Sequence, residues 1–439
     1  MSNQYISIAQ AIEKVELANK IFQQNKNDYQ NRPKDKIRKV GKVLLERKHE
    51  FAKVISSEMG KPVYESLAEI EKSALNCDFY ADNCDEFLKD RFYSTERYDA
   101  IVRNEPLGVI LGIMPWNFPF WQVFRFAVPT ILAGNTIVVK HASNVPQSAQ
   151  LIEEIFLEAG FEAGTYLNLS LKSDDVEAII EHPMIKAVSL TGSEKAGSSV
   201  ASIAGKNIKK SVLELGGSNA FIVMNDADLD NIMEKAMNAR FRNAGQSCIA
   251  AKRYLIQDGI YDEFLKRFTE RVKALKMGDP FDPETQIGPL AREDLAIDLE
   301  KQVNKSIAMG AQLITGGKRN GAFYEPTILT EVTSDMPVFI EETFGPVAAI
   351  KKFKTFDEAI ELSNETTFGL GVSILGENVE EYAAKAHLFE EGAVFFNQLV
   401  RSDPKLPFGG VKRSGFGREL SIDGIHEFVN VKTIVRSKV

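Results

Sequence analysis

Short apolar runs alternate with helical stretches along most of the chain. Between residues 108 and 215, the apolar runs are separated by stretches in which apolar residues recur every three to four positions. The strands predicted from these runs span residues 108–114, 136–140, 166–171, 185–190 and 210–215. Strands that alternate with helices in this way predict a parallel, doubly wound α/β sheet.

A second alternating series follows, so the chain is predicted to contain two α/β units. Its strands are expected at residues 220–224, 253–257, 347–353, 371–375 and 393–397. The stretch 35–90 has a helical pattern throughout, whereas 91–104 alternates like an exposed hairpin and 425–435 is strand-like. We predict that these last two segments pair and leave an edge for a second subunit.

These patterns divide the chain into three predicted parts. The first unit comprises residues 1–90 and 106–216, the second comprises 217–424, and the edge strands comprise 91–105 and 425–439. A chain of 439 residues is long enough for two or three domains. Its composition, 44% apolar and 26% charged, is typical of a folded globular protein and argues against disorder.

Charge and targeting features exclude several classes of protein. A net charge of −8 without a basic stripe argues against nucleic-acid binding. No apolar run reaches membrane-spanning length, and the helical pattern at 1–20 is interrupted by Glu13, Lys14 and Glu16, unlike a signal peptide. Three cysteines at unrelated spacings suit a reducing cytoplasm, and five histidines without ligand spacing predict no metal site.

One cysteine stands in a setting that suits a nucleophile. Cys248 lies in the small-residue turn 243–250, between a helical stretch and a strand, and Gly245 leaves room beside its sulfur. The peptide N–H groups of such a turn can stabilise a developing oxyanion. A buried, inert cysteine is the more common role for this residue type, so its surroundings have to decide.

Two polar residues at strand ends could take part in the same chemistry. Asn117, held between Pro115 and Pro119, can donate its amide to an oxyanion, or it can cap the helix that follows. Glu214 ends a strand beside the glycine pair 216–217, which allows close approach. It is either a general base or a structural ion-pair partner.

A glycine-rich turn follows the strand predicted at 185–190. Gly192, Ser193 and Gly197 open a helix, and the amides at a helix N-terminus can bind a pyrophosphate. The spacing differs from the usual dinucleotide fingerprint, and a strand-to-helix turn can need glycine for its geometry alone. The turn by itself leaves both interpretations open.

Six motifs in order make the chain similar to the aldehyde dehydrogenase family of NAD(P)-dependent enzymes. They occupy residues 115–119, 192–197, 214–217, 245–248, 341–346 and 407–410, and the last is followed by 412–419. The resemblance implies a Rossmann-like NAD(P)-binding domain in the first unit, an α/β catalytic domain in the second, and oligomerisation strands at the edge. It also implies oxidation of an aldehyde to a carboxylic acid by a homodimer or homotetramer.

The resemblance implies a role for each motif. Cys248 would attack the aldehyde, the Asn117 amide and the Cys248 N–H would hold the oxyanion, and Glu214 would activate the water that hydrolyses the thioester. Glu342 would hold the nicotinamide ribose and Phe344 would pack near the nicotinamide. The other implied cofactor contacts are Pro115, Trp116, Gly192, Ser193, Gly197 and Leu215.

Lys140 and Ser143 bear on the adenosine end of the cofactor. Many relatives bind the adenosine ribose with a lysine and a glutamate three residues later, and here Ser143 replaces that glutamate. A carboxylate would repel a 2′-phosphate, whereas a serine hydroxyl beside Lys140 can donate to it, so NADP is predicted as the preferred cofactor and NAD as the second. The alternative is that Ser143 only starts the following helix.

Two arginines suggest the substrate. Arg125 stands among aromatic residues that do not suit a solvent face, and Arg242 lies on the helix leading to Cys248, so both are expected to face the substrate. Enzymes similar to succinate-semialdehyde dehydrogenase carry arginine at these positions. Succinate semialdehyde, or another carboxylated aldehyde, is therefore the predicted substrate, with Ser402 as a third contact and Phe408 as a tunnel wall.

Two other functions stay open. The first is oxidation of a different semialdehyde, or a non-phosphorylating glyceraldehyde-3-phosphate dehydrogenase activity, because arginine also binds phosphate. The second is a catalytically retired protein that uses the same fold for binding or structure. Such a protein need not retain Cys248, Glu214 and Asn117 together, and all three are present.

Overall fold

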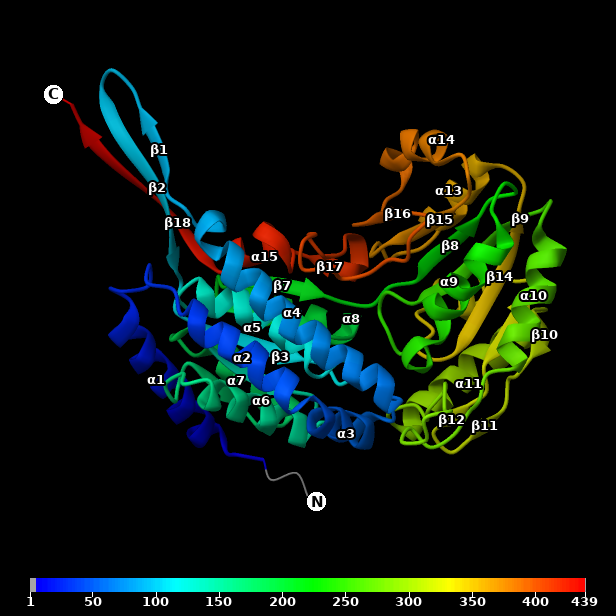
Figure 1. The fold of residues 1–439 in the computed structure, drawn as a ribbon, viewed down its shortest axis with the longest axis horizontal. Helices are drawn as coiled ribbons and strands as arrows, with labels where there is room; N and C mark the ends of the chain where they lie inside the picture. The colour runs from blue at the N-terminus through cyan, green and yellow to red at the C-terminus, as the bar shows by residue number, and fades with distance from the viewer. Residues whose placement is uncertain (1–4, 439) are drawn as a thin grey trace.

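A six-stranded sheet forms the centre of the first α/β unit in the computed structural model, which describes residues 5–438 (Figure 1). Its strands are β3 (Val109–Met114), β4 (Thr136–His141), β5 (Tyr166–Asn168), β6 (Ile185–Thr191), β7 (Lys210–Glu214) and β17 (Gly415–Phe416). The spatial order is β17-β7-β6-β3-β4-β5, and all neighbouring pairs except β17–β7 are parallel. The central strand β3 places Gly112 opposite Val139 of β4 and Ser189 of β6. The predicted parallel, doubly wound sheet is confirmed.

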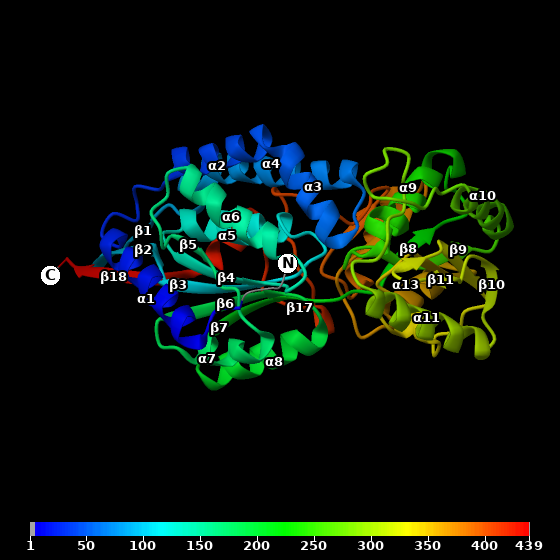
Figure 2. The ribbon, with the colours of Figure 1, turned by 90° about the horizontal axis from the view of Figure 1, so that it is seen from below.

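Helices cover both faces of this sheet, as Figure 2 shows. One face carries α2 (Lys34–Glu46), α3 (Lys48–Met59), α4 (Val63–Phe87), α5 (Trp121–Leu132) and α6 (Pro146–Glu158). The other carries α1 (Ile8–Asn25), α7 (Val176–Glu181) and α8 (Glu194–Lys206). The helix predicted at 1–20 begins at Ile8, behind a capping box made by Ser7 and Gln10, and residues 1–4 lie outside the described part of the chain.

One strand of the first sheet comes from late in the sequence. β17 pairs antiparallel with β7, and Gly415 lies opposite Glu214. The strand belongs to the range 217–424, which the sequence assigned to the second unit. Because β17 has only two residues, its hydrophobic pattern carries no recognisable period. The return of the chain nevertheless places residues 414–419 beside Glu214.

The second unit contains a seven-stranded sheet with the order β10-β13-β14-β9-β8-β15-β16. Its strands are β8 (Asn219–Val223), β9 (Ala251–Gln257), β10 (Gln312–Thr315), β13 (Thr327–Thr330), β14 (Val347–Phe353), β15 (Val372–Leu375) and β16 (Val394–Phe396). The helices are α9 (Leu229–Phe241), α10 (Tyr261–Lys273), α11 (Glu293–Ala308), α12 (Pro337–Ile340), α13 (Phe356–Asn364) and α14 (Val379–Ala384). The five predicted strands are present, whereas the sequence predicted no element in 277–346, where α11, β10, β13 and the ribbon β11 (Arg319–Asn320) to β12 (Phe323–Tyr324) lie.

A three-stranded sheet projects from the first unit (Figure 1). It contains β1 (Arg91–Ser94), β2 (Tyr98–Pro106) and β18 (Val429–Ser437), and β18 pairs antiparallel with β2 as predicted. The strand predicted at 425–435 starts too early, however, because α15 (Ser421–His426) places the buried Ile425 against the first unit. The outer edge of β18 pairs with no other strand of the described residues.

The structure also shows where the other two cysteines lie and whether any helix or side-chain group suits a membrane or a metal. Cys77 and Cys84 are buried on α4 with free thiols. Among the described residues, no helix is long and apolar enough to cross a membrane. Within residues 5–438, no group of three His, Cys, Asp or Glu side chains is placed to hold a metal ion.

Candidate active site

Cys248 lines a cavity between the two units. The cavity has a volume of about 400 Å³, and its walls come from α4 and α5 on one side and from β8, α9 and the loop 398–408 on the other. The predicted substrate contacts Arg125, Arg242, Ser402 and Phe408 line the same cavity. The structure therefore brings the predicted nucleophile and the predicted substrate-binding residues together.

The backbone before Cys248 is strained. Asn243 and Ala244 have φ values of 53° and 50°, and Gly245 has a φ of 74°, so consecutive residues adopt the left-handed region. Non-glycine residues there cost about 1–3 kcal/mol each and persist only where the surroundings hold them. A Cβ at Gly245 would also overlap the carbonyl oxygen of Gly345. Glycine is therefore required at this position for both its conformation and its packing.

Two buried glutamates of α4 hold this segment and the start of α5. Glu65 accepts a hydrogen bond from the Asn243 N–H at 2.7 Å. Glu69 accepts from the N–H groups of Phe120 and Trp121 at 2.9 and 3.1 Å. Neither glutamate carries a sequence signal, because α4 and its partners lie far apart along the chain.

Asn243 extends this network to the predicted oxyanion-binding residue. Its side-chain amide donates to the backbone carbonyls of Asn117 at 3.0 Å and Gln246 at 3.2 Å. Asn117 in turn donates its own amide to the Gln246 carbonyl at 3.1 Å. The Asn117 segment and the nucleophile turn are thus joined by direct hydrogen bonds.

Asn117 does not cap the helix that follows it. The N-terminal cap of α5 is Phe120, which makes no side-chain capping bond, so the capping alternative is wrong. An amide nitrogen has two hydrogens, and the bond to Gln246 uses one of them. The second hydrogen is not used by a hydrogen bond among the described residues, and Asn117 itself is 5% exposed and is not among the residues that line the cavity.

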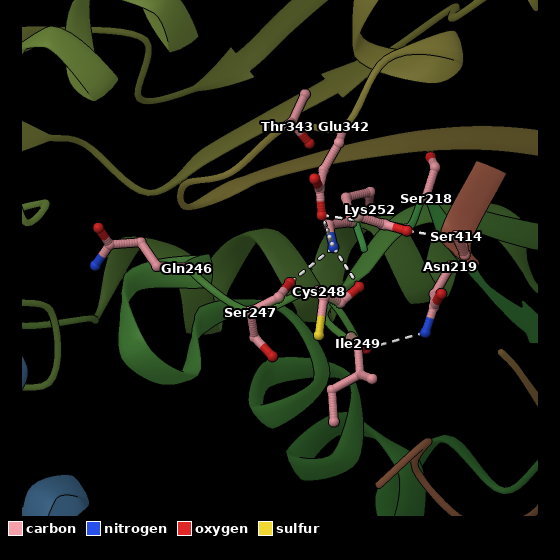
Figure 3. Close-up of polar contacts among 12 residues, drawn as sticks. Ser218, Asn219, Gln246, Ser247, Cys248, Ile249, Lys252, Glu342, Thr343 and Ser414 are labelled. Atoms are coloured by element: carbon pink, nitrogen blue, oxygen red, sulfur yellow. Dashed lines mark hydrogen bonds and ion pairs between the residues drawn. The ribbon is translucent and has the colours of Figure 1, made fainter. Parts of the chain in front are cut away.

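Lys252 lies between the nucleophile turn and Glu342, as Figure 3 shows, and it was not singled out from the sequence. Its ammonium donates to the carbonyls of Ser247 and Cys248, both at 2.7 Å, and to a carboxylate oxygen of Glu342 at 3.3 Å. Burial lowers the pKa of Lys252 to about 8, and the neighbouring Glu342 opposes that change. Lys252 therefore connects the turn of the nucleophile to the predicted ribose-binding carboxylate.

Burial and nearby cations have opposite effects on the ionisation of the Cys248 thiol. Burial raises its pKa, and the positive charges of Arg125 and Lys252 act in the opposite direction. A thiolate is the nucleophilic species, so the two cations favour reactivity while desolvation opposes it. An inert cysteine would need neither cation nearby.

Glu214 ends β7 in a buried position that carries unsatisfied oxygens. Its side chain is 2% exposed, and neither carboxylate oxygen has a hydrogen-bond partner among the described residues. Burial and the nearby Glu419 raise the pKa of Glu214 well above its usual range. Glu214 forms no ion pair with the described residues, as the structural alternative would require, and a raised pKa suits a carboxylate that takes up a proton.

Arg125 faces the cavity but is already paired. Its guanidinium forms a buried ion pair with Glu419, donates to Thr191 at 3.2 Å and lies 4.9 Å from the centroid of the Phe408 ring. The side chain is 2% exposed. Arg125 therefore lies at the cavity already joined to a buried carboxylate, and its contact with the substrate stays a prediction.

Arg242 and Ser402 line the same cavity but differ in exposure and in hydrogen bonding. Arg242 is exposed, and no carboxylate of residues 5–438 lies within ion-pair distance of it. Ser402 is 6% exposed, and its hydroxyl accepts from Lys72 at 2.7 Å and from the Trp121 indole at 3.0 Å. Arg242 is thus the more available of the two predicted arginines.

The predicted cofactor residues lie at the carboxyl edge of the first sheet. Ser193 caps α8 by accepting from the Ala196 N–H at 3.3 Å, and Gly192 lies between this cap and β6. A Cβ at Gly197 would overlap the side chain of Leu215, so glycine lets α8 approach β7 closely. The Gly197 position is explained by packing, whereas the N-terminus of the 13-residue helix α8 faces the edge where a pyrophosphate would bind.

A second group of cofactor residues lies across from that helix. Glu342 accepts from the Gly217 N–H at 3.1 Å, which places its carboxylate beside the Glu214 strand end. Trp116 and Phe344 form an edge-to-face pair with ring centroids 5.7 Å apart. Pro115 precedes Trp116 and is half-buried. These residues form one wall between β7 and the nucleophile turn.

Lys140 and Ser143 lie at the end of β4. Lys140 is 8% exposed, burial lowers its pKa, and its ammonium reaches Ser173 at 3.5 Å. Ser143 is exposed in the turn after β4. The N-terminal cap of α6 is Val145, so the alternative that Ser143 starts this helix is wrong.

Known proteins resemble this chain over nearly all of its length. The model of the aldehyde dehydrogenase family matches residues 3–434. The chain belongs to this family. It is 48% identical over 401 residues to a probable succinate-semialdehyde dehydrogenase (NADP(+)) of Synechocystis sp., covering 91% of this chain and 88% of that one. It is 47% identical over 408 residues to an Escherichia coli succinate semialdehyde dehydrogenase (NAD(P)+), with shares of 92% and 88%.

Solved structures of the family agree with the fold. The succinic semialdehyde dehydrogenase of Streptococcus pyogenes, crystallised in complex with NADP+, superposes with a TM-score of 0.95 at 39% identity. The superposition covers 98% of this chain and 96% of that one. The aldehyde dehydrogenase fold expected from the motifs is therefore confirmed.

The carboxyl edge of the first sheet fits the NAD(P) cofactor of the aldehyde dehydrogenase family. Lys140 is a nearly buried cation, and within the described chain no carboxylate lies within ion-pair distance of it. The N-terminus of α8 provides free amides, and Trp116 and Phe344 provide an aromatic wall. The phosphates of the dinucleotide would bind to Lys140 and to the amides of α8. The nicotinamide would pack against Trp116 and Phe344.

Replacing Lys252 by Met is expected to slow alkylation of Cys248 by iodoacetamide about tenfold at pH 7. An opposite charge within a few ångströms lowers a thiol pKa by about 1–3, and the variant lacks that charge. The difference is expected to shrink above pH 8, where Lys252 itself loses its proton. Lys209→Met is the matched control, because Lys209 also holds two backbone carbonyls, far from Cys248. Equal alkylation rates in all three proteins would contradict this role for Lys252.

Proposed function

We propose that this protein oxidises succinate semialdehyde, or a close carboxylated aldehyde, to the carboxylic acid with NADP preferred over NAD. The observation that carries the proposal is the cationic cavity that contains both Cys248 and Arg242. A carboxylate is a substrate group that such a cavity binds through charge-assisted hydrogen bonds. The names of relatives at 45–48% identity support the same substrate.

The residues support a two-stage reaction at Cys248. The Cys248 thiolate attacks the aldehyde carbon, and the Asn117 amide and the Cys248 N–H stabilise the oxyanion that forms. NAD(P), held by the residues named below, would supply the acceptor for the hydride that leaves this adduct. Glu214 then takes a proton from the water that hydrolyses the Cys248 thioester, which releases the acid and restores the thiol.

The proposed cofactor contacts divide among three parts of the site. Glu342 would bind the nicotinamide ribose, and Phe344 and Trp116 with Pro115 would flank the nicotinamide. Gly192 and Ser193 at α8 would hold the pyrophosphate, and Gly197 and Leu215 would set the approach of α8 to the sheet. Lys140 and Ser143 would bind the adenosine ribose and its 2′-phosphate.

A panel of aldehydes with both cofactors tests the proposed function. Succinate semialdehyde should exceed butanal and pentanal about ten- to hundredfold in kcat/KM, the discrimination expected for a charge-assisted hydrogen bond. Glyceraldehyde 3-phosphate belongs in the panel because Arg242 could also bind a phosphate. A higher kcat/KM for the phosphorylated aldehyde would replace the proposed substrate, and absence of oxidation with every aldehyde would support a retired enzyme.

Replacing Ser143 by Glu is expected to move the cofactor preference from NADP toward NAD. A carboxylate beside the adenosine ribose repels a 2′-phosphate and accepts from a free 2′-hydroxyl. The ratio of kcat/KM for NADP to that for NAD should fall about tenfold or more, a change of about 1.4 kcal/mol. Ser143→Ala is the control for loss of the hydroxyl alone. A parent enzyme that already strongly prefers NAD would contradict the proposed role of Ser143.

We also propose that the protein is a cytoplasmic homodimer or homotetramer. The outer edge of β18 pairs with no strand of the described residues, which supports assembly through strand pairing, and Phe92 and Tyr93 are exposed on the same three-stranded sheet. The three free thiols support a reducing compartment. Light scattering of the purified protein tests the assembly, and a monomer at micromolar concentration would contradict it.

A further inference from the structure

Lys72 of α4 lines the substrate cavity without a known role. Its side chain is half-buried, and its ammonium lies 4.0 Å from the centroid of the Trp121 ring. The same ammonium donates to the Ser402 hydroxyl at 2.7 Å. Lys72 therefore belongs to the wall that carries Trp121 and Ser402, opposite the second unit's contribution to the cavity.

Ser402 acts as a hydrogen-bond donor toward the cavity because of Lys72. A lysine ammonium and an indole N–H can only donate, and Ser402 accepts from both. These two bonds occupy the lone pairs of the hydroxyl oxygen. The hydroxyl hydrogen must therefore point away from Lys72 and Trp121, and the remaining direction is available to an acceptor on the substrate.

The charges that face Lys72 are mostly positive or already paired. Glu69, on the same helix, forms an ion pair with Lys61 and accepts two backbone N–H groups. Asp403 lies in the loop beside Ser402 and pairs with Arg401 at 3.8 Å. On the other elements, Arg125 of α5 and Arg242 at the end of α9 bring positive charge. Across residues 5–438, no carboxylate lies within ion-pair distance of the Lys72 ammonium.

We propose that Lys72 is a specificity-determining residue that receives the anionic end of the substrate together with Arg242 and fixes Ser402 as a donor to it. The inference rests on the proposed function, because it assumes a carboxylated aldehyde. The Lys72 ammonium is a cation without a counterion among the described residues, and an anionic ligand would stabilise it. Arg125 already forms a buried ion pair with Glu419. Lys72 then pairs with the substrate carboxylate.

This arrangement makes recognition of the carboxylate depend on pH. Burial, with Arg125 and Arg242 adding to it, lowers the pKa of Lys72 to about 7. Lys72 is protonated below this pH and loses its charge above it. The ratio of kcat/KM for succinate semialdehyde to that for butanal should therefore be highest below pH 7 and fall as the pH rises through 7. Titration of Cys248 affects both aldehydes and cancels in this ratio.

Kinetics of Lys72→Met and Lys72→Arg test the inference. The Met variant should lose about ten- to hundredfold in kcat/KM for succinate semialdehyde, mainly through KM, and change little with butanal. The Arg variant should recover part of the preference and lose the decline near pH 7, because a guanidinium does not titrate there. Lys48→Met is the matched control, because Lys48 pairs with Glu71 on the surface and does not line the cavity.

The outcomes separate this inference from the proposed function. If the parent enzyme does not prefer succinate semialdehyde to butanal, the proposed function fails. If the parent has the preference and Lys72→Met keeps it, or if the decline near pH 7 persists in Lys72→Arg, the role of Lys72 is wrong. Should the Met variant not fold, the pH profile of the Arg variant still decides between these results.

Discussion

Cys248→Ala is expected to abolish dehydrogenase turnover, and Glu214→Gln is expected to allow a single round of cofactor reduction and then stop. Loss of the nucleophile should reduce kcat by about four orders of magnitude or more. Loss of the base should reduce steady turnover about 10²- to 10⁴-fold, because only the hydrolysis step needs it. Stopped-flow absorbance should show a burst of reduced cofactor in the Gln variant, with an amplitude near one per site.

The Gln variant should also remain folded. Burial and Glu419 raise the pKa of Glu214 in the folded protein. Ionisation of Glu214 therefore destabilises the fold, and this cost grows as the pH rises from the ordinary pKa to the folded-state pKa and is fully present above it. Glutamine removes the charge without changing the size of the side chain. Cys77→Ala, which removes a buried thiol remote from the site, is the control for Cys248→Ala. Full steady turnover of either active-site variant would rule out the assignment.

Arg125→Ala is expected to impair the enzyme with every aldehyde and to destabilise the fold. The substitution leaves Glu419 buried without its partner and close to Glu214, and breaking a buried pair in this way costs about 3–5 kcal/mol. The loss should be smaller at low pH, because protonation of Glu419 removes the unpaired charge. Urea unfolding at two pH values measures this change, and kcat/KM should fall for both succinate semialdehyde and butanal.

Two comparisons identify the cause of that loss. Combining Arg125→Met with Glu419→Gln should restore much of the free energy of unfolding, because neither charge is then buried alone. Arg242→Ala, in contrast, should affect mainly the carboxylated aldehyde, because Arg242 is exposed and forms no ion pair with a carboxylate of the described residues. Destabilisation below about 1 kcal/mol in Arg125→Ala, with a selective loss for succinate semialdehyde, would instead place Arg125 at the substrate.

The structure also changes how the nucleophile is understood. The sequence pointed to Gly245 and the peptide N–H groups of the turn, which are local features. The structure adds Glu65 on one side of the turn and Lys252 on the other, and both bind backbone atoms. Because the residues before Cys248 adopt strained conformations, these contacts stabilise a geometry that the local chain does not favour.

Local patterns in the sequence determined the scaffold and the reactive groups. The period of the apolar residues predicted β3, β4, β6 and β7, and glycine and serine at the start of α8 predicted a helix N-terminus, because these features depend on neighbours within a few positions. The motifs around Cys248, Glu214 and Asn117 identified the family for a similar reason, since each motif is continuous in the chain.

Only the tertiary structure decided which charges are available. Arg125 and Glu419 are separated by most of the chain, so their pairing could not be read from either segment. The same holds for Lys72 with Ser402 and for Lys252 with Glu342. The start of β18 at Val429 likewise depends on burial of α15 against the first unit, which overrides the local strand pattern. Burial and long-range pairing set the pKa and the accessibility of each group, and both arise only when distant segments meet.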